Sequence, residues 1–121
     1  MSTTNAMRTR PRYAGAVDAV TMFIHNTLKA IFGYGNSTAD VSMTNLVSNT
    51  GVVATDVTGV GTARHALAAA GYGTDKAIFG YGTTTGPVSM TNLVSNTGVV
   101  ATDVTGVGTA RASLAAAGYG V

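Results

Sequence analysis

Short segments of alternating apolar and polar residues, separated by glycine-rich turns, recur along this 121-residue chain. In residues 29–35 the alternation places Ala30, Phe32 and Tyr34 on one face, as in a β-strand. Residues 41–48 alternate in a similar way, and the Asn-Thr-Gly that follows them is typical of a hairpin loop. The pattern therefore predicts a mainly β protein built from short strands.

The strand-like segments repeat with a period of 47 residues. Residues 41–64 recur without change as residues 88–111, and only seven of the 46 aligned pairs differ over the whole repeat. Four of these seven lie in one block, residues 36–40 against 83–87. Because connecting loops tolerate variation that packed strands do not, we expect this variable block to be an exposed turn.

The period divides the chain into an N-terminal arm and two repeats. The arm spans residues 1–28, the first repeat residues 29–75 and the second repeat residues 76–121. Each repeat is expected to hold four strands, which in the first are residues 29–35, 41–48, 52–55 and 64–70. The last of these is open to two interpretations, because its alanines favour a helix while the turn at residues 73–75 favours a hairpin. We favour the strand.

The arm also has two interpretations. Apolar residues from Val17 to Ile31 recur at helical spacing, which predicts an amphipathic helix that anchors the chain to a partner. Alternatively, residues from Pro11 onward form a degenerate first strand of the first repeat, so residues 14–32 are either helix or strand. In the anchor interpretation, the contacts come from three basic and two apolar side chains: Arg8, Arg10, Arg12, Val20 and Ile24.

Composition narrows the function classes. Cysteine is absent, which excludes disulfides, thiolate zinc sites and a cysteine nucleophile. Beyond residue 13 the charges nearly balance, whereas a nucleic-acid-binding domain carries a basic stripe on its folded face. The apolar stretch at residues 14–32 contains Asp18, His25 and Lys29, so it is a poor membrane span, and no secretory leader is expected. We expect a soluble protein with no specific nucleic-acid or membrane partner.

Candidate reactive side chains are few. The repeat replaces His65 with Ala112, and His25 lies in the arm, so the two histidines do not suggest a set of metal ligands. Asp56 and Asp103 occur in the same turn-rich context, where an aspartate commonly stabilises the turn. We therefore predict no catalytic, cofactor or metal site and no enzyme activity.

Four tyrosines recur next to glycine in the repeats. A tyrosine offers a flat apolar ring with a polar tip, which suits either packing between repeats or a surface that binds sugars or partners. We favour packing and keep the surface as the alternative. The residues concerned are Tyr34, Tyr72, Tyr81 and Tyr119.

The order of segments resembles a kelch blade. A strand led by Arg64 is followed by a short turn and an apolar strand that ends in glycines, although Gly80-Tyr81-Gly82 stands in place of the double glycine and tryptophan is absent. Arrays of AIFGYG, NLVSNTG and AAAGYG also resemble those in structural proteins of tailed bacteriophages. The resemblances imply an incomplete kelch-like propeller or an open β array in a non-enzymatic virion protein that decorates a capsid or tail or builds a fibre.

Two repeats leave sheet edges open. A propeller needs about four to eight blades to close, and an open edge is a template for pairing with another chain. We therefore expect a homo-oligomer or docking onto a larger virion assembly, and location in the virion. The alternative function is an adhesion module that binds a carbohydrate, such as a host-surface glycan, or a protein.

Overall fold

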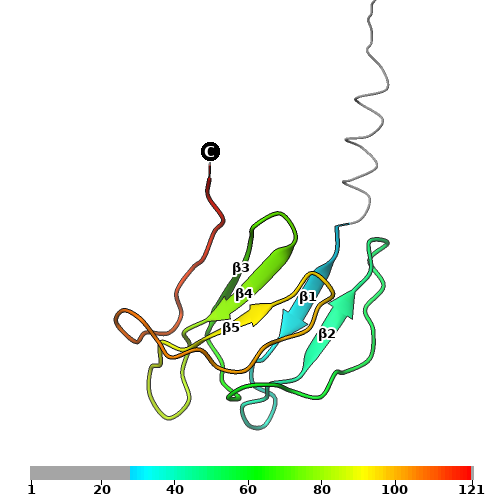
Figure 1. Ribbon diagram of the computed structural model, residues 1–121. Helices are drawn as coiled ribbons and strands as arrows, with labels where there is room; N and C mark the ends of the chain where they lie inside the picture. The colour runs from blue at the N-terminus through cyan, green and yellow to red at the C-terminus, as the bar shows by residue number, and fades with distance from the viewer. Residues whose placement is uncertain (1–27, 121) are drawn as a thin grey trace, which may run out of the picture.

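The computed structural model describes residues 28–120, which form two small antiparallel sheets and no helix in that range (Figure 1). In the first sheet, β1 (Ala30–Gly33) pairs with β2 (Thr44–Val47). The second sheet has the order β3 (Ala68–Tyr72), β4 (Lys76–Gly80), β5 (Thr91–Val94). The mainly β prediction is confirmed.

The two repeats place their shared segments in the same register. Ala30 lies opposite Val47 in the first sheet, and Ala77 lies opposite Val94 in the second, one repeat period later. The turn predicted at residues 73–75 joins β3 to β4 as a hairpin, and Gly73 has the positive φ of 61° that such a turn requires. The strand interpretation of the alanine-rich segment is therefore correct from Ala68 onward, and the helix interpretation is wrong.

The prediction of four strands per repeat is wrong. Residues 52–55 and 99–102, expected as strands, are joined to their neighbours through single bridges such as Val47 to Val53. A side chain takes over where the ladder would continue, because the Asn45 side-chain amide donates to the Ala54 carbonyl oxygen at 3.1 Å. Residues 64–67 and 111–117 likewise lie outside the strands.

The hydrogen-bonded sheets do not follow the repeat boundary. By sequence β3 belongs to the first repeat, but it pairs with β4 of the second. The main hydrophobic core likewise combines residues of both repeats: Tyr34 of the first with Phe79, Val94 and Val100 of the second. The repeats are thus joined both by strand pairing and by shared apolar packing.

Residues that are identical in sequence differ in burial between the repeats. Phe79 is 3% exposed whereas its counterpart Phe32 is 63% exposed, and Val100 is 8% exposed against 53% for Val53. The sequences around each pair are the same, so the difference comes from position alone. The second repeat packs these side chains against the first repeat, and the first repeat presents the same side chains to solvent.

A glycine in each repeat permits a close approach of two loops. A Cβ atom on Gly59 would lie 2.7 Å from the carbonyl carbon of Ser42, and a Cβ on Gly106 would lie equally close to that of Ser89.

Gly59→Ala and Gly106→Ala are each expected to lower the free energy of unfolding by about 1–3 kcal/mol, since the backbone must move to make room. Urea denaturation followed by circular dichroism measures the loss. Gly86→Ala is the control, because nothing lies within 4 Å of its Cβ position; equal midpoints for all three variants would contradict the steric argument.

Candidate functional site: an arginine-centred contact between the repeats

Arg64 is completely buried and joins the two repeats. Its Nε donates to the Tyr81 carbonyl oxygen at 2.7 Å, and its Nη1 donates to the Thr62 carbonyl oxygen at 3.0 Å. Its Nη2 donates to Oδ1 of Asn92 at 2.7 Å, and the guanidinium lies 4.7 Å from the centre of the Tyr34 ring. The planar fork of arginine suits this arrangement, because it supplies several donors in fixed directions.

A chain of polar side chains continues from this arginine. Asn92 is also fully buried, and its Nδ2 donates to the Ala101 carbonyl oxygen at 3.1 Å and to Oδ1 of Asp103 at 2.9 Å. The Asp103 carboxylate in turn accepts hydrogen bonds from the Thr62 backbone N–H at 3.1 Å and the Thr62 hydroxyl at 2.6 Å. The polar chain therefore returns to the first repeat, and both repeats are held at two points.

Tyr34 forms the apolar wall of this contact. Its ring centre lies 5.1 Å from that of Phe79, and its hydroxyl donates to the Val60 carbonyl oxygen at 2.8 Å. Burial raises the pKa of the Tyr34 hydroxyl, an effect that the charge of Arg64 partly opposes. Tyr34 also has a positive φ of 62°, which is costly for a tyrosine, so these contacts fix an unfavourable backbone conformation.

Acid is expected to weaken the contact. Burial acts to raise the pKa of Asp103, but hydrogen bonds from Thr62 and Asn92 and the charge of Arg64 outweigh it, so the pKa lies below its usual range. A carboxyl with a lowered pKa stabilises the fold fully above its unfolded pKa of about 3.9, and loses that contribution as the pH falls through its folded value. Urea midpoints measured from pH 5 to lower pH should therefore fall. They should fall less steeply for Asp103→Asn, and equal slopes for the two proteins would contradict this role of Asp103.

Each half of the contact occurs a second time without its complement. Arg111 is exposed. Its Nη1 donates to the Thr109 carbonyl oxygen at 3.0 Å, and its guanidinium lies 4.5 Å from the Tyr81 ring centre. These contacts match those that Arg64 makes with Thr62 and Tyr34 of its own repeat. At the opposite end of the pair of repeats, Asn45 Nδ2 donates to Oδ1 of Asp56 at 2.8 Å, as Asn92 does to Asp103. Within residues 28–120, no arginine donates to Asn45 in the way that Arg64 donates to Asn92.

A histidine and a carboxylate meet beside the variable block of the first repeat. His65 Nδ1 lies 2.7 Å from Oδ1 of Asp40, which also accepts from Asn36 Nδ2 at 2.9 Å. The Asn36 hydrogen bond, followed by the effects of His65, holds the pKa of Asp40 below its usual range. The second repeat has Pro87 and Ala112 at the two positions, so the pair is specific to the first repeat. It ties the variable turn to the segment that follows Arg64.

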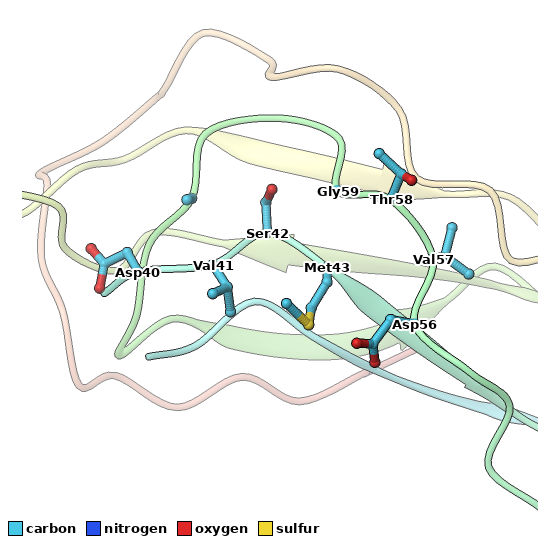
Figure 2. A pocket seen from close by; sticks show the side chains of 9 residues that line it. Asp40, Val41, Ser42, Met43, Asp56, Val57, Thr58 and Gly59 are labelled. Atoms are coloured by element: carbon cyan, nitrogen blue, oxygen red, sulfur yellow. The ribbon is translucent and has the colours of Figure 1, made fainter. Parts of the chain in front are cut away.

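A shallow depression occurs at the same place in both repeats, and in the first repeat it lies next to this pair. In the first it has a volume of about 390 Å³ and runs between residues 40–43 and 56–59, with Asp40 and Asp56 at opposite ends (Figure 2). Its counterpart in the second repeat is lined by residues 87–90 and 103–106. Among the described residues, neither depression nor any other region brings together three or more histidine, aspartate or glutamate side chains that could hold a metal ion.

The tyrosines predicted as a surface lie in different environments. Tyr34 is 8% exposed and Tyr81 is partly buried, whereas Tyr72 is 40% exposed and Tyr119 is fully exposed. The predicted anchor residues Arg8, Arg10, Arg12, Val20 and Ile24 lie outside the described residues. No helix within residues 28–120 is long and apolar enough to cross a membrane.

Sequence reasoning did not identify Arg64, Asn92 and Asp103 as one site. The available signal was their exact repetition in a chain with very few charges, since Arg111, Asn45 and Asp56 are the same residues one period away. Comparisons with family models, curated proteins and solved structures found no match.

Proposed function

We propose that this chain is a non-enzymatic structural protein of a phage virion, a capsid or tail decoration or a fibre subunit, that acts through assembly. The observation that carries the proposal is the arginine-centred contact, in which Arg64, Asn92 and Asp103 are engaged in joining one repeat to the next. A chain whose buried polar groups join one repeat to the next is suited to a structural role in an assembly. The resemblance of its repeats to arrays in structural proteins of tailed phages is the reason for proposing that this assembly is a virion.

The architecture that we propose is the open β array, the second of the two forms expected from the repeats. Two properties favour it over an incomplete kelch-like propeller. The sheets have two and three strands, and the recurring contact residues Asp56 and Arg111 are exposed, one at each end of the pair of repeats. An array of this kind extends by adding units to its ends.

The virion role is tested on purified particles of the virus or host that encodes the chain. Mass spectrometry of the particles, with immunogold labelling by an antibody against residues 28–120, should find regular copies on the shell, tail or fibres. Absence from the particles, with recovery of the chain only as free protein, would overturn the proposal. Binding of that free protein to a glycan array would then favour the adhesion module.

A further inference from the structure

We propose that a second copy of this chain docks head to tail on the first by repeating the contact that joins the two repeats. The inserting face, defined as Tyr81, Val107, Thr109 and Arg111, would occupy the receiving face, defined as Phe32, Asn45, Val53 and Asp56. The inference rests on the proposed function only in that both require assembly.

The polar groups of the two faces are complementary. Arg64 reaches Asn92 and Thr62 reaches Asp103 across the existing contact. Displaced by one repeat period, the same pairs become Arg111 with Asn45 and Thr109 with Asp56. Arg111 already has the local arrangement of Arg64, above its tyrosine ring and bonded to the carbonyl two residues before it. Docking therefore supplies the acceptors that the exposed arginine lacks in the described chain.

The apolar groups of the two faces are complementary as well. Tyr34 covers Phe79 in the existing contact, and Tyr81 would cover Phe32 of the next copy in the same way. Phe32 is 63% exposed and Val107 is 83% exposed, whereas Phe79 is 3% exposed. Removing such side chains from water favours association.

Strand pairing extends the same contact. Residues 115–119 repeat the sequence of β3, but they form no strand, and Figure 1 draws this red C-terminal segment without an arrow. In the described residues β1 pairs only with β2, so the edge that corresponds to the β3-paired edge of β4 is open. Ala69 lies opposite Phe79, and the displaced register places Ala116 opposite Phe32 of the second copy. An open edge of this kind is a template for an added strand.

The two faces differ, so the contact is heterologous. Each docked copy again presents one free inserting face and one free receiving face, and such contacts generate a ring or a filament. The side chains named for the two faces match those of the internal contact, because residues 41–64 and 88–111 are identical and residues 29–35 recur as residues 76–82. The bridge between His65 and Thr83 would become one between Ala112 and Asn36, and it is made by backbone groups.

Complementation between two variants of the full chain tests the docking. Arg111→Ala removes the inserting arginine, and Phe32→Asp places a charge in the receiving face at an exposed position. Val52→Asp is the control, because this valine and its counterpart Val99 are 65% and 64% exposed, so the internal contact covers neither.

Light scattering should show assemblies for the wild type and Val52→Asp, and monomers for each face variant alone. Mixed in equal amounts, the two face variants should form one dimer and stop, since only one intact pair of faces exists. A monomeric wild type would overturn the proposal. A face variant that still forms a dimer by itself would overturn it as well.

Cysteine cross-linking tests the register, since the chain has no cysteine of its own. Tyr72 lies opposite Lys76, so the displaced register places Tyr119 opposite Lys29 of the second copy. Opposed residues of antiparallel strands lie within disulfide range, so Tyr119→Cys with Lys29→Cys should give a ladder of linked copies on a non-reducing gel. Ala116→Cys with Lys29→Cys is the off-register control and should give far less. Equal ladders, or none, would overturn the register.

Deletion of residues 1–27 tests whether the N-terminal segment, in place of a second copy, covers the open edge of β1. Assembly that is unchanged by the deletion supports docking of a second copy. Assembly that occurs only after the deletion would show that the N-terminal segment covers this edge, and would overturn the proposal for the whole chain. A chain present in virions but monomeric and never cross-linked would overturn the docking alone; a self-assembling chain absent from virions would overturn the virion role alone.

Discussion

Replacing Arg64 with alanine is expected to lower the free energy of unfolding by about 3–5 kcal/mol, which is the range for breaking a buried charged network. The substitution leaves three acceptors without their donor: Oδ1 of Asn92 and the carbonyl oxygens of Tyr81 and Thr62. Small domains have only about 5–15 kcal/mol in total. The variant should therefore unfold at a much lower urea concentration than the wild type, measured by circular dichroism.

The repeat provides a matched control for this prediction. Arg111→Ala removes the same residue from the same local sequence, but at an exposed position, so the loss should stay within about 0.5 kcal/mol. Both variants are compared at protein concentrations where Arg111→Ala is monomeric. Arg64→Lys keeps the positive charge without the fork and should recover only part of the loss. If Arg64→Ala and Arg111→Ala shifted the urea midpoint equally, burial of Arg64 between the repeats would be wrong.

Phe79→Ala is expected to cost about 3–4 kcal/mol, because it removes a buried aromatic side chain and leaves a cavity. Phe79 is 3% exposed, contacts Tyr34 at 5.1 Å between ring centres and lies in the main hydrophobic core. Urea denaturation followed by circular dichroism measures the cost.

Phe32→Ala is the control for this second prediction. The two phenylalanines occupy the same place in KAIFGYG, but Phe32 is 63% exposed, so its removal should change the stability of the monomer by less than about 0.5 kcal/mol. The ratio of the two effects measures how differently the identical side chains are used. Similar losses would contradict the burial difference between the repeats.

The sequence predicted those features that depend on local pattern. Alternation and turn residues located β1, β4 and the β3–β4 hairpin, and the variable block that ends at Asp40 forms the expected turn, closed by a bridge from Asn36 to Asp40. The strand ends were less predictable, because the Asn45 and Asn92 side chains bond to backbone that the ladder would otherwise use.

The environment of each residue could not be predicted in this way. Phe32 and Phe79 have the same neighbours in sequence, so no property of the local pattern distinguishes the exposed side chain from the buried one. The same holds for Arg64 and Arg111. What distinguishes them is whether the other repeat lies beside them, which is a property of the tertiary structure.

The pairing of β3 with β4 determines where the chain can be divided or lengthened without breaking a sheet. Division at residue 75, where the repeated sequence divides, would separate two paired strands. A module that begins near residue 62 and ends near residue 108 keeps β3, β4 and β5 together and still spans one period. Insertion of a further copy of that module would preserve every existing register while adding one sheet. The length of such a protein can therefore change in steps of one whole module, without redesign of any contact between modules.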